Sequence, residues 1–319
     1  MQYELQDRLV IGIASSALFD LRESDAVFRR SGTDTYRQYQ EAHLDERLGA
    51  GVAFPFIKRL LSLNDLSEPA DPLVEVIVLS RNDPDTGLRV MRSIQAHGLS
   101  ISRAVFMQGR SPYEFMPAFN MSLFLSANDD DVREAVAAGL PAGRVLASAA
   151  VDDDSKDLRI AFDFDGVLAD DASERVMHGG SLQDFQDHEV ANVATPHNPG
   201  LLKGLLANIN RIQQREEARR LADPQYRIRV HVAIVTARSA PAHERAVLSL
   251  KEWGVTVNDA FFLGGIDKSK VLAILKPHIF FDDQVSHVLT ASHVAPSVHI
   301  PFGIANESAA ARPPDGPAA

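Results

Sequence analysis

Short runs of apolar residues alternate with helical patterns along most of this chain, and few folds accommodate that alternation. The runs are rich in Val, Ile and Phe, and segments with the apolar spacing of helices lie between them. Such βα units build a mainly parallel sheet with helices packed on its faces. We predict eight strands, namely Leu9–Ile13, Val74–Leu79, Arg103–Met107, Ser122–Leu125, Leu158–Phe162, Arg229–Val235, Ala260–Leu263 and His278–Phe281.

Four of these strands fall in each half of the chain, and the two halves can be laid over one another. Val74–Val132 matches Val230–Val288 without a gap, so that VEVIVLS lies on VHVAIVT and SLFLSAND on HIFFDDQV. Near the start, LVIGIASSALFDL lies on LRIAFDFDGVLAD. We interpret this register as an internal duplication of an α/β unit. The alternative is that two doubly wound sheets align through their shared periodicity alone.

The domain organisation follows from this register. We predict a first half over residues 1–145 and a second over 146–304, joined by a linker within Gly139–Asp157, which mixes small residues, a proline and an acidic run. The second half carries a long insertion at about 171–226, with helical patterns in Leu201–Leu221. Residues 305–319 have too few large apolar side chains to offset the entropy of ordering, so a disordered tail is expected there.

Composition excludes several classes of protein. The net charge of -11 and the pI of about 5.4 argue against a nonspecific nucleic-acid binder, which needs an excess of Lys and Arg. The chain has no cysteine, so disulfides, thiolate zinc sites and cysteine nucleophiles are absent. The charged N-terminal segment does not resemble a secretory signal, and no apolar run is long enough to span a membrane. We therefore expect a cytoplasmic location without a membrane partner, and the sequence leaves a homo-oligomer open.

The strongest chemical signal lies at the end of the strand Leu158–Phe162. Asp163 and Asp165 follow this strand, and residues two apart on extended chain point the same way. The carboxyl end of a strand in a parallel sheet is where ligands bind. Two neighbouring carboxylates repel each other, so we expect a cation there, and Mg²⁺ suits oxygen ligands shared with a phosphate. Gly166 allows the chain to turn at once.

Four short segments together resemble the motifs of the haloacid dehalogenase-like phosphatases. They occur in the order of that family, and three of them adjoin a predicted strand. The segments are Asp163-Phe-Asp165-Gly-Val, Val235-Thr236-Ala-Arg238, Asp267-Lys268-Ser-Lys270 and Phe280-Phe281-Asp282-Asp283. The resemblance implies a Rossmann-like α/β fold and phosphoryl transfer to an aspartate.

The resemblance also implies a role for each site residue. Asp163 would be the nucleophile, Asp165 the general acid and base, and Thr236 a donor to the phosphoryl oxygens. Lys268 or Lys270 would neutralise the charge of the transferring group; we favour Lys268 as catalytic and assign Lys270 to substrate binding. The metal set would be Asp163, Asp165, Asp283 and Asp282, with Asp283 favoured as the ligand from the last pair. Arg238 would contact phosphate or pair with an acidic neighbour.

The first half lacks this chemistry. In the register above, Ala14 and Ser16 lie opposite Asp163 and Asp165, while Ser126 and Ala127 lie opposite Asp282 and Asp283. Ser80, opposite Thr236, keeps a hydroxyl. We therefore predict that the first half is degenerate and plays a structural or substrate-contacting role.

Nearly the whole chain resembles the cytosolic type I 5'-nucleotidases and their bacterial relatives. The segments that carry this resemblance are LVIGIASSALFDL, AFDFDGVLADDASERV and FFLGGIDKSKVLAILKPHIFFDDQVSH. It implies Mg²⁺-dependent hydrolysis of nucleoside 5'-monophosphates, with the insertion at 171–226 as a cap that sets substrate choice. Within that cap, Phe185, His188 and Asn192 are candidate base contacts; a plain amphipathic helix is the alternative.

Two other functions stay open at this point. Within the same chemistry, the substrate could be a sugar phosphate or another small phosphorylated metabolite. In a different class, the chain could be a nucleotide-sensing or partner-binding protein with little turnover. Base preference and sugar preference are not fixed by the sequence.

Overall fold

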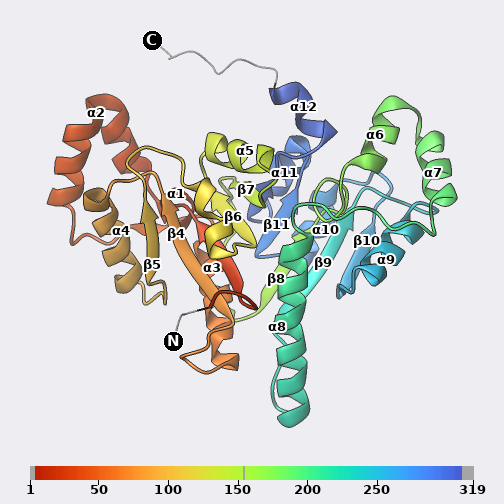
Figure 1. The fold of residues 1–319 in the computed structure, drawn as a ribbon, viewed down its shortest axis with the longest axis horizontal. Coiled ribbons are helices and arrows are strands. Elements are labelled where there is room, and N and C mark those ends of the chain that lie inside the picture. The colour runs from red at the N-terminus through yellow and green to blue at the C-terminus, as the bar shows by residue number, and fades with distance from the viewer. Residues whose placement is uncertain (1–3, 154, 311–319) are drawn as a thin grey trace.

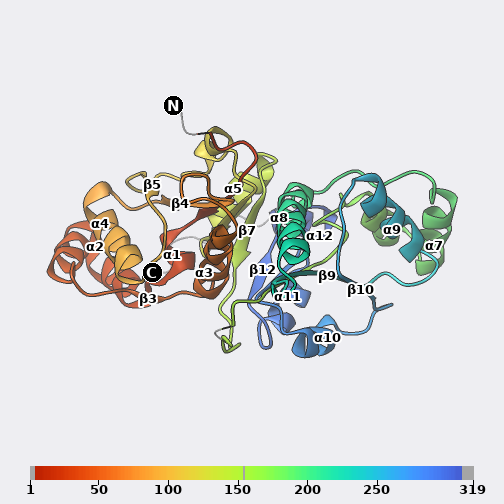
Figure 2. The ribbon, with the colours of Figure 1, turned by 90° about the horizontal axis from the view of Figure 1, so that it is seen from below.

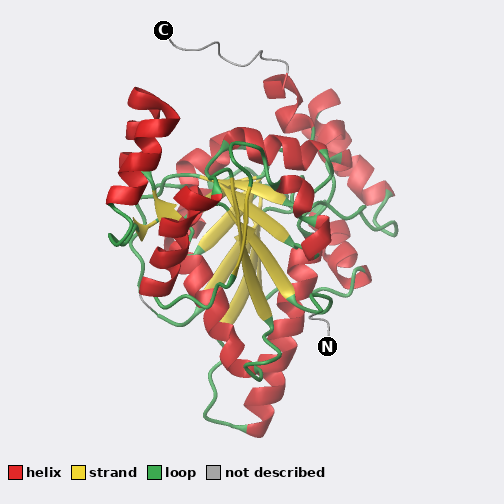
Figure 3. Cartoon of the chain, turned by 60° about the vertical axis from the view of Figure 1, so that its left-hand side comes forward, coloured by secondary structure: helices red, strands yellow, loops and turns green. Residues whose placement is uncertain are grey.

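The computed structural model describes residues 4–153 and 155–310. These residues form one ten-stranded, mostly parallel sheet with helices on both faces (Figures 1 and 3), which confirms the predicted α/β class. From one edge to the other the strands are β10 (Asp259–Phe262), β9 (Val230–Thr236), β8 (Leu158–Phe162), β11 (Ile279–Asp282), β12 (Ser297–His299), β7 (Ala142–Val145), β6 (Leu123–Ser126), β1 (Leu9–Ile13), β4 (Val74–Ser80) and β5 (Arg103–Phe106).

The two halves of the sheet have the same internal order. From the outer edges inward, β5-β4-β1-β6-β7 mirrors β10-β9-β8-β11-β12, and every pairing within a half is parallel. The halves meet at β7 and β12, which pair antiparallel. Ala14 N–H donates to the Leu125 carbonyl at 2.8 Å, and Asp163 N–H donates to the Phe281 carbonyl at 2.8 Å. The residues after β1 and β8 therefore make equivalent backbone hydrogen bonds to β6 and β11. The halves therefore share an architecture, and their common origin stays a prediction.

All eight predicted strands are present, with ends within one residue of those expected. The ten-stranded sheet has two further strands that were not predicted, β7 and β12. β7 lies within Gly139–Asp157, so this segment is not only a linker as expected but also supplies a strand of the sheet. The sequences AGRV and SVH are short and partly polar, so they do not have the pattern of a strand. They become strands because they pair with neighbouring strands of the sheet.

Helices connect the strands. They are α1 (Ser15–Leu18), α2 (Arg22–Ala42), α3 (Phe54–Ser62), α4 (Pro84–Ala96), α5 (Asp129–Ala137), α6 (Ala172–Gly179), α7 (Leu182–Ala191), α8 (Lys203–Ala222), α9 (His243–Glu252), α10 (Lys268–Leu275), α11 (Val285–Ala291) and α12 (Ile304–Ala310). Short 3₁₀ turns lie at Leu63–Leu66, Tyr113–Phe115 and Pro117–Phe119, and β2 (Phe19–Asp20) pairs antiparallel with β3 (Gly49–Ala50) in a separate two-stranded sheet. Among the described residues, no helix combines the length and apolar character needed to cross a bilayer.

The insertion after β8 divides into two parts. Leu205, Leu206 and Ile209 of α8 are buried in the same core as the sheet strands β1 and β8. Figure 2 shows α8 end-on beside the middle of the sheet, whereas α7 lies at one end of the molecule. A cap over the whole of 171–226 was expected; the structure instead packs α8 against the sheet and leaves α6 and α7 as the part that lies away from it.

Part of the segment predicted to be a disordered tail forms a helix. Residues 304–310 form α12, so the disorder predicted from residue 305 is corrected for this stretch; residues 311–319 lie outside the described part of the chain. Asn306 is buried, and its side-chain amide donates to the carbonyl oxygens of Asp283 at 3.0 Å and Phe302 at 2.8 Å. These bonds, rather than apolar burial, tie the start of α12 to the body of the protein.

Candidate active site

Three neighbouring strands of the second half deliver the predicted site residues to one edge of the sheet. Asp163 follows β8, Thr236 ends β9 and Asp282 ends β11, and these strands lie in the order β9-β8-β11. Because parallel strands end at the same edge, residues far apart in sequence meet here. All three side chains are almost fully buried, with exposed fractions of 4%, 1% and 0%.

Lys268 bridges two of these carboxylates. Its ammonium Nζ lies 2.7 Å from Asp163 Oδ2 and 2.6 Å from Asp282 Oδ2. Lys268 is the first residue of α10, and the preceding Asp267 caps that helix by accepting a bond from Ser269 N–H at 2.8 Å. Burial opposes the charged form of Lys268, yet Asp163 and Asp282 hold its pKa above the ordinary value. Lys270, the other predicted lysine, is exposed.

Asp283 differs from Asp282 in having no partner. It is 1% exposed, and neither of its carboxylate oxygens has a hydrogen-bond partner among the described residues. Burial, together with the nearby carboxylates of Glu174 and Asp163, raises its pKa well above the usual range. A buried charge without a partner is costly, so this carboxylate calls for a cation or a proton.

Gly166 packs directly against Asp283. It adopts a φ of +69°, and a Cβ at this position would lie 2.5 Å from the carboxylate carbon of Asp283. The glycine therefore lets the loop after β8 approach Asp283 closely, which brings the Asp163–Asp165 segment to the Asp283 carboxylate.

Of the four predicted metal residues, Asp283 is the one whose carboxylate the structure leaves available to a cation. Asp163, Asp282 and His287 have ligand atoms within 4.8 Å of one another, but the Lys268 ammonium bonds to both of those carboxylates. Both oxygens of Asp165 accept bonds from Arg238. The Asp283 oxygens, by contrast, are unsatisfied, and carboxylate oxygens are the ligands that Mg²⁺ prefers.

Asp165 is held by Arg238. The Arg238 Nη2 and Nε atoms donate to the two Asp165 oxygens at 2.6 and 2.7 Å, in a bidentate ion pair. Of the two predictions for Arg238, phosphate contact or an acidic neighbour, the structure contains the second. The guanidinium also lies over the rings of Phe164 and Phe185, at 5.1 and 5.3 Å from their centres.

Arg238 links Asp165 to a buried carboxylate of the cap. Glu189 on α7 is 1% exposed and pairs with Arg238 and, at 2.9 Å, with Arg245. It also accepts a bond from Ser173 Oγ at 2.7 Å and lies 3.1 Å from His197 Nε2. Burial opposes ionisation of Glu189, but His197 and Arg238 hold its pKa far below the ordinary value.

The predicted base contacts in the cap have structural partners. Phe185 is buried against Arg238, His188 Nδ1 lies 3.2 Å from Glu189 Oε1, and Asn192 donates to the His188 carbonyl at 2.8 Å. These three side chains therefore stabilise α7 and its contact with Arg238.

Sequence reasoning missed several residues around the site. Glu174 faces Asp283 from α6, while His299 and Asn306 bond the Asp283 carbonyl at 2.9 and 3.0 Å. Glu189 and His197 join the cap to Arg238. None of these belongs to one of the four motifs, and only their spatial proximity reveals them.

Comparisons with known proteins identify the family of this chain. A sequence model of the family described as 5'-nucleotidase matches residues 1–307. The chain is 32% identical over 297 residues to human cytosolic 5'-nucleotidase 1B, an alignment that covers 89% of this chain and 47% of the relative. The chain thus spans about half the length of that relative, and no solved structure matches it. The chain belongs to the 5'-nucleotidase family, in its cytosolic type I branch.

Proposed function

We propose that this chain is a divalent-cation-dependent 5'-nucleotidase, which hydrolyses nucleoside 5'-monophosphates to nucleoside and phosphate. The observation that carries the proposal is the buried Lys268, which bonds Asp163 and Asp282 beside the partnerless carboxylate of Asp283. Family membership over nearly the whole chain supports the same activity.

In the proposed reaction Asp163 is the nucleophile. One of its oxygens forms a bond to phosphorus while the bond from phosphorus to the 5' oxygen breaks, giving an aspartyl-phosphate. Water then attacks phosphorus and releases Asp163 and inorganic phosphate. Lys268 offsets the negative charge around Asp163, and the Thr236 hydroxyl, which accepts a bond from Arg238 N–H at 3.3 Å, can donate its own proton to a phosphoryl oxygen.

Asp165 is the proposed proton carrier. It would protonate the leaving 5' oxygen and take a proton from the attacking water in the second step. The bidentate pair with Arg238 fixes the orientation of the Asp165 carboxyl group at the end of β8. We therefore assign Arg238 to the positioning of Asp165.

Mg²⁺ is the proposed cation, and Asp163, Asp165 and Asp283 are its proposed ligands. When bound, it would neutralise the charge that develops on the phosphoryl oxygens. Asp282, which bonds Lys268 and accepts from Gln284 N–H at 2.8 Å, is the proposed orienting neighbour of this set. Phe185, His188 and Asn192 are proposed to act on substrate choice through the position of α7.

Phosphate release from AMP, IMP, dUMP and sugar phosphates, with Mg²⁺ and with a chelator, tests this function. We expect phosphate release from the nucleotides when Mg²⁺ is present. We expect the chelator to abolish this release. Equal release from sugar phosphates would favour a general small-metabolite phosphatase. No release from any compound would favour a nucleotide-sensing protein.

Two lysines of one helix provide a matched pair of variants. Lys268→Met should lower turnover by about 10²- to 10³-fold, the usual cost of removing one transition-state donor. Lys270→Met, at an exposed position two residues away, should leave turnover near wild type, and its predicted role in substrate binding would show in KM alone. Circular dichroism checks that both variants fold, and Asp163→Asn serves as the isosteric loss-of-nucleophile variant. Equal turnover for both lysine variants would contradict the assignment.

A further inference from the structure

The first half contains a cavity at the position that corresponds to the candidate active site. Its volume is about 670 Å³, and all of its lining residues lie between 14 and 131. It opens at the carboxyl ends of β1, β4 and β6, which occupy the same places in their half as β8, β9 and β11 in the other. A cavity of 300–1,000 Å³ at such a switch point is of the size that binds small molecules.

The floor of this cavity carries hydroxyls where the other half carries charges. Ala14 and Ser16 line it at the positions of Asp163 and Asp165, and Ala127 lines it at the position of Asp283. Ser15 and Ser80 also face it, and their hydroxyl oxygens lie 3.0 Å apart. The serine hydroxyls of this floor can bond the hydroxyls of a ligand.

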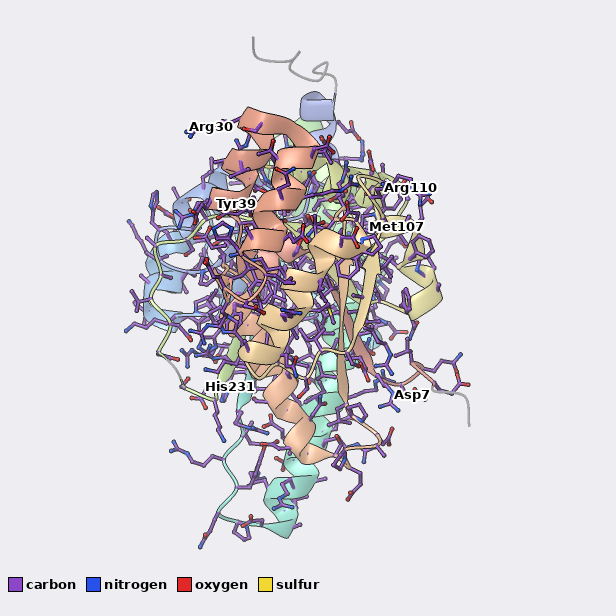
Figure 4. The ribbon with its side chains drawn as sticks, turned by 90° about the vertical axis from the view of Figure 1, so that its left-hand side faces the viewer. Asp7, Arg30, Tyr39, Met107, Arg110 and His231 are labelled. Atoms are coloured by element: carbon purple, nitrogen blue, oxygen red, sulfur yellow. The ribbon has the colours of Figure 1, made fainter. Side chains whose placement is uncertain are left out.

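One wall of the cavity is aromatic. Phe28 and Tyr36 of α2 pack edge to face with ring centres 5.6 Å apart, and both line the cavity. Phe28 is 49% exposed, which is unusual for a phenylalanine in a chain with so large a core. Figure 4 looks onto this end of the molecule, where Arg30 and Tyr39 mark α2, and Met107 and Arg110 mark the loop after β5. A flat ring stacking on Phe28 would cover this exposed apolar surface.

The charges around the cavity do not favour a phosphate. Arg37 donates to Asp83 at 2.8 Å, and Arg81 donates to Asp131 at 2.7 Å, so each guanidinium already has a carboxylate partner. Asp83 caps α4, and the first turn of α5 holds three aspartates, so the positive ends of both helices face acidic groups. Asp25 adds a further acidic residue to the lining.

We propose that this cavity binds an uncharged nucleoside. Its base would stack on the exposed ring of Phe28, beside Tyr36, and its ribose hydroxyls would bond the serines of the floor. An aromatic wall, a hydroxyl-bearing floor and neutralised arginines together match a ring joined to a polyhydroxylated sugar without a phosphate. The proposal rests on the cavity alone and does not depend on the activity of the second half.

Calorimetric titration of the full chain with adenosine and with uridine tests the proposal. Phe28→Ala should raise the dissociation constant about tenfold, since stacking on a base contributes about 1–3 kcal/mol. Ser16→Leu should abolish binding by filling the floor. Phe115→Ala, at a residue that is 39% exposed and outside the cavity lining, is the matched control and should bind as wild type.

Three results would overturn the proposal. Wild-type chain that binds neither nucleoside would exclude it directly. Unchanged binding by both Phe28→Ala and Ser16→Leu would place the nucleoside elsewhere, including the candidate active site. Displacement of bound adenosine by millimolar inorganic phosphate would identify the cavity as an anion site instead.

Discussion

Single side chains at the candidate active site differ in how far the sequence reveals them. Asp163, Thr236 and Asp282 lie at strand ends, where a motif and a strand prediction together fix their meeting point. The sequence favoured Lys268 over Lys270, and in the structure Lys268 is buried against two carboxylates whereas Lys270 is exposed. The sequence did not predict the contacts of Glu189 and Asn306, since each bonds a partner that is distant in sequence.

Gly166 provides a prediction at this scale. An alanine here would adopt a φ of +69° and direct its methyl group into the Asp283 carboxylate. We expect Gly166→Ala to weaken Mg²⁺ activation at least tenfold, because the loop and Asp283 must move apart. Phosphate release against Mg²⁺ concentration measures this. Gly98→Ala, with a φ of +67° and open space around it, controls for backbone strain alone. An unaltered Mg²⁺ dependence in Gly166→Ala would contradict the close approach.

At the scale of elements, the strands of βα units were predictable and the short connecting strands were not. Long apolar runs such as β4 and β9 have a pattern that only a buried strand satisfies. β7 and β12 are ordered by their neighbours, and α8 has the helical pattern expected of a cap while its apolar face belongs to the main core. A periodic pattern identifies a helix without identifying the surface on which it packs.

The contact of α7 with the body of the protein gives the prediction for this scale. Glu189→Gln would leave Arg238 and Arg245 without their shared buried carboxylate, and removing one partner of a buried ion pair costs about 3–5 kcal/mol. We expect a lower urea midpoint, together with faster amide exchange in α7. Asp187→Asn, at an exposed residue of the same helix, should leave both unchanged. Equal midpoints for the two variants would show that the Glu189 cluster does not hold α7.

Over the whole molecule, one sheet joins the two halves. β7 and β12 form its central pair, and Gly143 of β7 lies against Val298 and Ile300 of the other half. The sequence overlay predicted a duplicated α/β unit, but it predicted neither the strand order nor the antiparallel pairing of β7 with β12. No local pattern in either half encodes the direction in which the two halves meet.

The packing of β7 against β12 leads to a prediction about how the molecule unfolds. A Cβ on Gly143 would lie 2.3 Å from Val298 Cγ1, so Gly143→Ala should cost about 1–3 kcal/mol by overpacking. Because the core is continuous across the sheet, we expect one cooperative transition that shifts as a whole. Gly204→Ala, with open space around its Cβ, should be neutral or slightly stabilising. Two separate transitions, only one of them shifted, would show that the halves unfold independently.

The amide of Asn306 reaches back to the Asp283 carbonyl from the helix with which the described residues end. A truncation before α12 would therefore remove a hydrogen bond that holds the backbone of Asp283 in the proposed cation site. It would do so without deleting any motif residue. A fusion partner placed close to α12 would act on the same anchor. A protein produced for study should therefore keep the residues through Asn306, so that this bond to Asp283 is preserved.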